Sequence, residues 1–282
     1  MSYKTILVHV DKSEGVNERI NLAATIALNE DAHLIGAAPT GVSRYIYQSG
    51  MLGDTSGFSA HLEEHLELLR QQGKEALAAF EAGVKRLGVS SFESQLIDDE
   101  AGAGMSLLAR YSDLVVIGQT NLEEPSPSTL PDFPEFVVLN SGRPVLIVPY
   151  AGHAKTAGKR IAIAWDASVS ATRAVVSAIP LLQRADNVDV LVFNPEVEGD
   201  VHGEQPGADI ALYLARHGIK VNVTRQKTRV DIGNALLSSI VDLASDMLVM
   251  GGYGHSRFRE ILLGGVTRTV LESMTVPVLM SH

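Results

Sequence analysis

Short apolar runs alternate with longer amphipathic stretches along the whole chain. The runs ILVHV, LVVIG and VLIVP are bounded by turn residues, as buried parallel strands are. Between such runs, apolar residues recur at helical spacing in residues 16–30, 61–88, 170–185, 207–218 and 232–245. Strand alternating with helix predicts right-handed crossovers, and therefore an α/β fold built on doubly wound parallel sheets.

The same pattern occurs twice. KTILVHVDKS resembles KRIAIAWDAS, SDLVVIGQ resembles SDMLVMGG, and GRPVLIVPY resembles TVPVLMSH. Ser112 and Ser245 are 133 positions apart, and so are Pro144 and Pro277. We therefore predict two homologous domains, each with room for about five strands.

The predicted domains are residues 1–150 and 159–282, joined by the small-residue linker AGHAKTAG. Near the start of each copy the offset is larger, because Asp11 and Asp166 are 155 positions apart. The first copy thus carries about 22 additional residues in its middle (155 less 133).

Composition narrows the classes of function. The chain has 282 residues and a formal net charge of −10, which argues against non-specific binding to nucleic acid or to an anionic membrane. It has no cysteine, which excludes disulfides, Cys-based zinc sites and thiol catalysis. No stretch of about 20 apolar residues occurs, and the first apolar run is too short for a signal peptide. We therefore expect a cytoplasmic protein.

The topology of the sheet indicates where a ligand would bind. In doubly wound sheets, ligands lie beyond the carboxyl ends of the strands, at the switch point where the strand order reverses. The residues just after the first and fourth strands are then Asp11 and Gly118 in the first copy, and Asp166 and Gly251 in the second. These four positions are the first candidates for a site.

A glycine-rich segment follows the fourth strand of the second copy. Gly251 and Gly254 are followed, after nine residues, by Gly264 and Gly265 at the start of a predicted helix. Glycines let the backbone approach a phosphate closely, and a helix N-terminus favours an anion. The segment is locally basic, with three arginines against one glutamate: Arg257, Arg259 and Arg268 against Glu260. It therefore predicts phosphate binding, with His255 and Arg257 as further contacts.

Two tandem copies, an Asp after the first strand, and the spacing G-x-x-G-x9-G before the last helix resemble the universal stress protein family. The resemblance covers essentially the whole chain. It implies the strand order 3-2-1-4-5 in each domain and the binding of ATP, with or without Mg²⁺, as the cofactor.

The resemblance also implies roles for individual residues of the second copy. Asp166 would lie near the adenosine, and Gly251 and Gly254 near the ribose and phosphates. Backbone N–H groups would hold the phosphates at Gly264, Gly265 and Val266. The family usually has Ser or Thr where this chain has Gly265, and Thr267 is the candidate to replace that hydroxyl.

The first copy serves as an internal control. Its corresponding loop, residues 118–142, has no glycine between its ends and carries four prolines and four acids without one Lys or Arg. Such a loop would repel a triphosphate. We therefore predict one nucleotide site per chain, in the second copy. The first copy would be a structural or regulatory partner within an intramolecular pseudo-dimer, and a further homodimer stays open.

Two other motifs have simpler interpretations. His61 and His65 fit H-x-x-E-H, a zinc-hydrolase pattern, but the leucines around them indicate the polar side of an amphipathic helix, so no metal site is assigned. AGAGMSLLA lacks the third glycine of a dinucleotide fingerprint and indicates the start of a helix. Ser168 or Ser170 is expected to cap the helix after Asp166.

The leading hypothesis is a stress-response protein that binds ATP or a related adenine nucleotide in its C-terminal domain. The sequence shows no metal-binding carboxylate pair or water-positioning base near the loop. We therefore expect the protein to bind the nucleotide without fast turnover, with slow hydrolysis as the remaining alternative. The alternative is a non-nucleotide interaction module that binds a protein partner or another small ligand.

Overall fold

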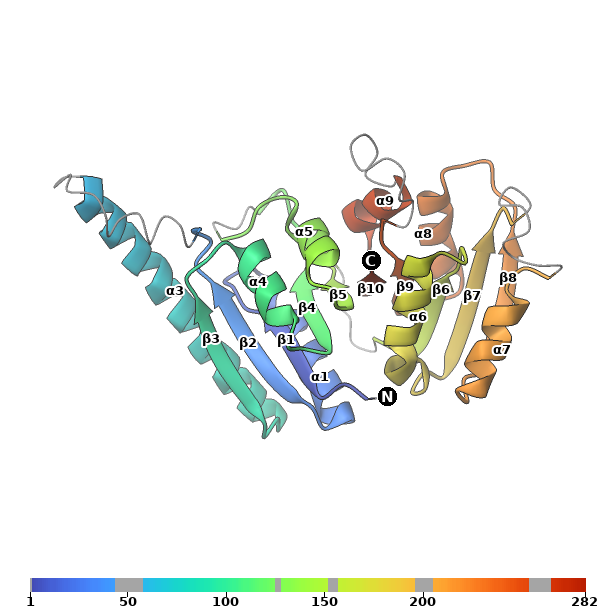
Figure 1. Ribbon diagram of the computed structural model, residues 1–282, viewed down its shortest axis with the longest axis horizontal. Coiled ribbons are helices and arrows are strands. Elements are labelled where there is room, and N and C mark those ends of the chain that lie inside the picture. The colour runs from blue at the N-terminus through green and yellow to red at the C-terminus, as the bar shows by residue number, and fades with distance from the viewer. Residues whose placement is uncertain (1, 44–57, 125–127, 152–156, 196–204, 254–264) are drawn as a thin grey trace. The chain divides into compact units, whose positions relative to one another are not determined.

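A computed structural model describes residues 2–43, 58–124, 128–151, 157–195, 205–253 and 265–282. The chain divides into two compact units (Figure 1), the first formed by Tyr3–Arg143 and the second by Pro144–His282 together with the N-terminal residues 1–2. Each unit has the alternating strands and helices that the sequence predicts.

The first unit holds four parallel strands in the order β3-β2-β1-β4. Helices α1 and α3 pack together on one face, and α4 and α5 pack together on the other (Figure 1). The bounds are β1 Thr5–His9, α1 Val16–Glu30, β2 His33–Pro39, α3 Phe58–Leu87, β3 Phe92–Ile97, α4 Ala101–Ala109, β4 Leu114–Gly118 and α5 Phe133–Asn140. Helix α4 is the segment AGAGMSLLA, so its prediction as a helix is confirmed.

The second unit has strand order β5-β10-β9-β6-β7-β8. Its five strands β6 to β10 are parallel and reproduce the expected order 3-2-1-4-5. The bounds are β5 Val145–Val148, β6 Arg160–Ala164, α6 Val169–Leu182, β7 Asn187–Phe193, α7 Ala208–Arg216, β8 Asn222–Gln226, α8 Ile232–Asp242, β9 Met247–Gly251, α9 Gly265–Ser273 and β10 Val278–Ser281.

Strand β5 departs from the expectation of purely parallel sheets. It groups with the second unit and pairs antiparallel with β10, with Leu146 opposite Leu279. Both strands are fully buried apolar runs. An apolar strand left at an edge exposes unpaired backbone groups, so pairing β5 with β10 covers an edge that the repeat alone would leave open.

The repeat is visible in a shared junction. Asp113 of the first unit accepts hydrogen bonds from the backbone N–H groups of Lys4 and Thr5, at 2.7 and 3.0 Å. Asp246, 133 positions later, accepts them from residues 158–160. The Ser-Asp pair that revealed the repeat therefore fixes the start of the first strand to the start of the fourth strand in each unit.

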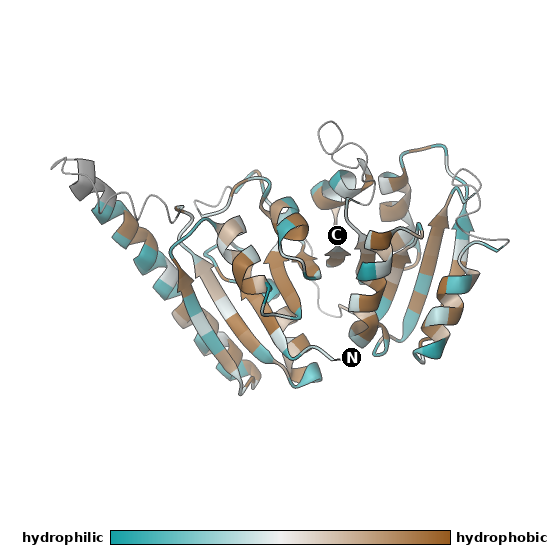
Figure 2. Ribbon diagram, viewed as in Figure 1, coloured by the Kyte–Doolittle hydropathy of each residue, from teal (hydrophilic) through white to brown (hydrophobic). Residues whose placement is uncertain are grey.

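The strands form the apolar centre of each unit, as the brown arrows of Figure 2 show. The helices approach the sheet closely where glycine permits it. A Cβ atom on Gly36 of β2 would lie 2.4 Å from the ring of Phe80, a completely buried residue of α3. In the part of the chain that the structure describes, no helix is long and apolar enough to cross a membrane.

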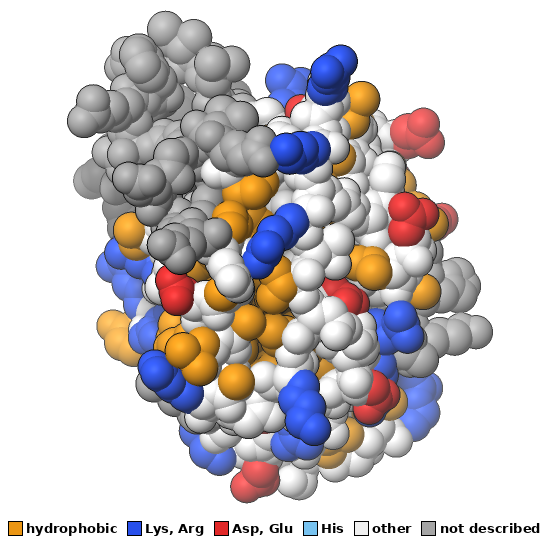
Figure 3. Space-filling model, turned by 90° about the vertical axis from the view of Figure 1, so that its right-hand side faces the viewer, with side chains coloured by type: hydrophobic (Ala, Val, Ile, Leu, Met, Phe, Trp, Pro, Cys, Tyr) orange, Lys and Arg blue, Asp and Glu red, His pale blue; other side chains and the backbone are white. Residues whose placement is uncertain are grey.

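Strand β8 ends the sheet of the second unit, and its side chains are half-buried or exposed. The face that carries this end of the unit mixes hydrophobic side chains with Lys and Arg (Figure 3). Exposed Lys220, Arg225 and Lys227 lie on or beside β8. Positive charges along an edge strand oppose edge-to-edge pairing with another chain.

Candidate nucleotide site

The predicted site of the second unit begins where β6 and β9 end side by side, with Ile163 paired to Val249. Gly251 is the last residue of β9. A Cβ atom there would lie 2.5 Å from both Ser170 Oγ and the backbone nitrogen of Ala171. Glycine is therefore required at this position, because it lets the N-terminus of α6 reach the end of β9.

The chain turns sharply between β6 and α6. Ala167 has a left-handed backbone, with φ of 58°, and the N–H of Ser168 donates to Asp166 Oδ1 at 2.9 Å. Ser168 Oγ then accepts from the N–H of Ala171 at 3.1 Å, which confirms the predicted helix cap. Asp166 is exposed, so its carboxylate is accessible at the switch point.

Helix α9 supplies the second part of the predicted site. Thr267 is 4% exposed, and its Oγ1 accepts a hydrogen bond from the N–H of Tyr253 at 3.4 Å. This contact ties the beginning of the glycine-rich segment to α9. Gly265 opens the helix in open space, because a Cβ atom there would meet nothing within 4 Å. Val266 follows it and is half-buried.

The other predicted site residues are Gly254, His255, Arg257 and Gly264. They lie outside the described residues, so their contacts stay predictions. Asp166 and Gly251 are brought together through the first turn of α6. Thr267 is tied to Tyr253, which begins the same segment.

The family model described as the universal stress protein family matches residues 158–282, which contain this switch point and helix α9. The match falls on the second unit of the chain. No curated protein matches the sequence.

Solved structures extend the similarity to the whole chain. A universal stress protein from Archaeoglobus fulgidus DSM 4304 is 15% identical, with a TM-score of 0.73 over 98% of this chain and 97% of its own. A putative universal stress protein from Pseudomonas aeruginosa UCBPP-PA14 is 14% identical, with a TM-score of 0.60 over 98% and 92%. At these identities the likeness shows the fold alone.

A shorter structure covers about half of the chain. It is a universal stress protein from Archaeoglobus fulgidus in complex with dAMP, 17% identical, with a TM-score of 0.36 over 52% of this chain and 98% of its own.

The first unit of the chain has a different switch point. Arg19 of α1 donates from Nη2 to Asp11 Oδ1 at 2.6 Å and from Nε to the carbonyl of His9 at 2.7 Å. The side chains of Arg19 and Asp11 are 4% and 9% exposed. A Cβ atom on Gly118 would collide with the Arg19 guanidinium. Beside Gly118 the protein's own arginine therefore takes the place that Ser170 and Ala171 take beside Gly251.

This buried cluster shifts two protonation equilibria. Burial by itself raises the pKa of Asp11, but the charges of Arg19 and His9 and hydrogen bonds from Ser13 together hold that pKa well below its usual range. Burial also lowers the pKa of His9 to about 4. The His9 ring packs against Phe133 at 4.9 Å, and neither ring nitrogen has a hydrogen-bond partner among the described residues. His9 is therefore a neutral imidazole at pH 7.

Sequence reasoning missed Arg19. Two signals could have revealed it. Arg19 lies on the buried side of α1 with Ala23 and Ile26, at helical spacing. The second repeat also has Ala174 at the equivalent position, 155 residues later. Comparing the repeats position by position would have singled out this difference.

The histidine motif lies only partly within the described residues. His65 is exposed on α3, and the side chain of His61 lies outside what the structure describes. Among the described residues, no group of three or more His, Cys, Asp or Glu side chains could hold a metal ion.

Proposed function

We propose that the second unit binds ATP or a related adenine nucleotide, with little or slow hydrolysis, as part of a cytoplasmic response to stress. One observation carries the proposal. Ala174, a small residue, stands where the first unit has Arg19, and Asp166 is left exposed beside Gly251. The Asp166 carboxylate is therefore accessible to a ligand from solution, at the place where doubly wound folds bind one.

The remaining contacts follow from the G-x-x-G-x9-G spacing. Asp166 would contact the adenosine, and Gly251 and Gly254 would lie near the ribose and phosphates. The phosphates would meet backbone N–H groups of Gly264, Gly265 and Val266, where the N-terminus of α9 favours negative charge. His255 and Arg257 would add positive charge. The Thr267 hydroxyl, which accepts from the N–H of Tyr253, would be the candidate side-chain donor to a phosphate.

Calorimetric titration of the full chain with ATP tests this proposal, with and without Mg²⁺. One nucleotide per chain is the expected stoichiometry. A folded protein that releases no heat at millimolar ATP would overturn the proposal. Incubation with ATP followed by product analysis measures any slow hydrolysis.

The alternative function, a non-nucleotide interaction module, is favoured by two observations. The first switch point is filled by the Asp11–Arg19 pair, and the second carries Gly265 in place of the family's hydroxyl. A double variant, Asp166→Ala with Gly254→Val, separates the two functions. If the folded variant retains its role in cells, nucleotide binding is not that role, and a protein partner or another ligand is to be sought. The homodimer and the pseudo-dimer stay predictions.

A further inference from the structure

Strand β8 presents an unpaired backbone edge at the end of the second unit. The carbonyl of Gln226 accepts a hydrogen bond from the N–H of Asn194, just beyond β7, at 2.9 Å, so the backbone groups of Gln226 face β7. Because these groups alternate sides along a strand, those of Val223 and Arg225 point away from β7. No described residue pairs with them. The N–H and C=O groups of Val223 and Arg225, called here the outer edge of β8, can therefore serve as a template for another strand.

The outer edge of β8 is basic in a chain that is acidic as a whole. Residues 219–230 contain four Lys or Arg and no Asp or Glu, although the formal net charge of the chain is −10. The four are exposed: Lys220, Arg225, Lys227 and Arg229. Figure 3 looks onto this end of the unit, where Lys and Arg side chains lie around hydrophobic ones. The positive charge is therefore concentrated where the backbone is unpaired.

Three of these charges are not neutralised by the described part of the unit. The Nε of Arg225 donates to the carbonyl of Pro206 at 2.8 Å, which holds the guanidinium beside the edge but supplies no negative charge. No carboxylate among the described residues forms an ion pair with Lys220, Arg225 or Arg229. Their charges therefore remain available to acidic groups of a partner.

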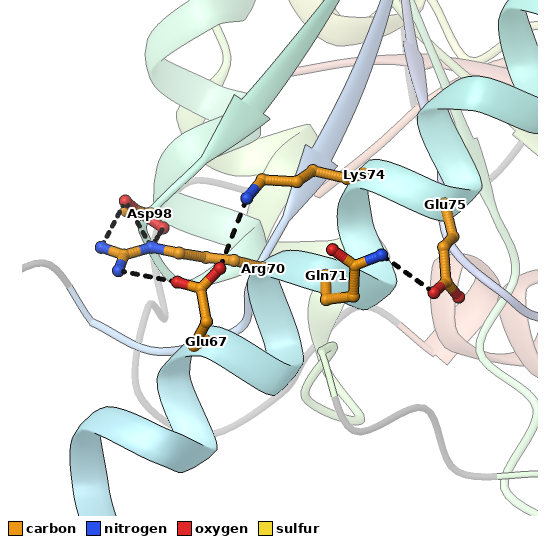
Figure 4. Close-up of polar contacts among 6 residues, drawn as sticks. All are labelled: Glu67, Arg70, Gln71, Lys74, Glu75 and Asp98. Carbon is orange, nitrogen blue, oxygen red and sulfur yellow. Dashed lines mark hydrogen bonds and ion pairs between the residues drawn. The ribbon is translucent and has the colours of Figure 1, made fainter. Parts of the chain in front are cut away.

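Strand β3, which ends the sheet of the first unit, differs in both respects. Residues 88–109, which contain it, carry four acids and no Lys or Arg. Asp98, just beyond β3, has its Oδ2 at 2.9 Å from Nη2 of Arg70 on α3, and Glu67 of the same helix also faces Arg70 (Figure 4). The charges at this end thus bind the helix of their own unit. The comparison singles out β8 as the edge whose charge a partner could use.

We propose that the outer edge of β8 is a docking site for an acidic, extended segment of another protein, which joins the sheet as a further strand. Backbone hydrogen bonds to Val223 and Arg225 provide the pairing, and carboxylates beside Arg225 and Lys220 provide the selectivity. Two β8 edges would bring like charges together, so a second copy of this chain is not the partner.

The backbone of the edge also favours a peptide over a nucleic acid. A phosphodiester backbone offers acceptors but no N–H donors, so it would leave the carbonyls of Val223 and Arg225 unpaired. Strand β7 separates this edge from β6 and the switch point, so the site does not depend on nucleotide binding.

A synthetic peptide of about eight alternating Glu and Val residues is a suitable probe, titrated into the full chain and followed by calorimetry and amide hydrogen exchange. Binding should slow the exchange of the Val223 and Arg225 N–H groups and leave that of Thr224, which faces β7, unchanged. The same peptide N-methylated at every residue keeps its carboxylates but cannot donate to the edge, and should bind at least about tenfold more weakly. No binding of the parent peptide at about 1 mM, or equal binding of the N-methylated form, would overturn the proposal.

Charge reversal at the edge locates the site. Lys220→Glu with Arg225→Glu should weaken peptide binding about tenfold or more, and Lys220→Glu alone by about threefold. Arg86→Glu with Arg110→Glu is the matched control, because it changes the net charge equally at exposed positions of the first unit. Each variant is first checked for an unchanged melting temperature.

Two results would contradict this assignment. One is an equal loss of peptide binding in the two double variants, which would mean that net charge alone attracts the peptide. The other is an oligothymidylate of similar length that binds the parent protein as tightly as the acidic peptide, which would mean that the edge selects any polyanion. ATP titration of the same variants reports separately on the switch point.

Discussion

The two switch points of this chain share the same backbone arrangement but differ in the side chains that surround it. In both units, the serine two residues beyond the aspartate donates its N–H to that aspartate, Ser13 to Asp11 and Ser168 to Asp166. In both, the fourth strand ends in glycine. They differ at one helical position, Arg19 in the first unit and Ala174 in the second, and in the loop that follows the fourth strand. The comparison teaches that a repeated fold can keep the backbone of a switch point while its side chains change, so that a buried arginine packs beside Gly118 in the first unit only.

The largest expected effect comes from breaking the internal pair of the first unit. Arg19→Ala leaves Asp11 buried without its cation, which should lower the free energy of unfolding by about 3–5 kcal/mol. Urea denaturation measures this loss. Arg268→Ala is the control, because Arg268 forms an exposed pair with Glu272 and its loss should cost less than about 1 kcal/mol. Similar losses in the two variants would contradict a buried role for Arg19.

The second prediction concerns acid sensitivity, which should reside in the first unit. The pKa of His9 falls from 6.5 in the unfolded chain to about 4 in the fold. Between these values the unfolded state binds the additional proton, so stability is complete above pH 6.5 and decreases as the pH falls towards 4. The decrease should approach about 3 kcal/mol.

A repeat-matched variant isolates this histidine. The second unit has Ala164 at the position equivalent to His9, 155 residues later, so the test is His9→Ala. Urea denaturation from pH 4 to pH 7 should give a smaller slope of stability against pH in the variant than in the parent. Parallel slopes would show that other groups are responsible for the acid sensitivity. Asp11 does not complicate the window, because its lowered pKa places its own loss of stability below pH 4.

The third prediction introduces the buried arginine of the first unit, Arg19, at the equivalent position of the second unit. Ala174 is buried, and in Ala174→Arg the guanidinium should extend towards Asp166 as that of Arg19 extends to Asp11. ATP affinity should then fall by about tenfold or more, a cost of about 1.4 kcal/mol. Thr172→Arg adds the same charge on the exposed side of the helix and should leave the affinity nearly unchanged. A folded Ala174→Arg protein with parental affinity would show that the arginine does not distinguish the two units.

The smallest effect concerns the hydroxyl that Gly265 lacks. A side chain at Gly265 would enter open space, so Gly265→Ser is expected to fold normally. If the serine donates one hydrogen bond to a phosphate, the affinity for ATP should rise about fivefold, near 1 kcal/mol. Gly15→Ser, at another open position in the first unit, is the control and should leave the affinity for ATP unchanged. If the ATP affinity of Gly265→Ser is unchanged, a hydroxyl at this position does not contribute to phosphate binding.

Much of the fold was predictable because local pattern and tertiary structure agree. Helix α1 spans the predicted residues 16–30, and α4 is the short glycine-containing segment identified as a helix. The direction of β5 was not predictable, since an apolar run does not encode the orientation of its neighbour. Arg19 was overlooked because an arginine in an amphipathic helix normally faces solvent. Its burial depends on the meeting of β1, β4 and α1 in space.

The pairing of β5 with β10 has a consequence for how the chain can be divided. A fragment that begins at Lys159 would contain five parallel strands but would leave one side of β10 unpaired. Such an edge invites association with other chains. A fragment that begins at Pro144 would keep β10 paired on both sides and would leave the outer side of β5 as its edge instead. The place at which the chain is cut therefore decides which apolar strand becomes the edge.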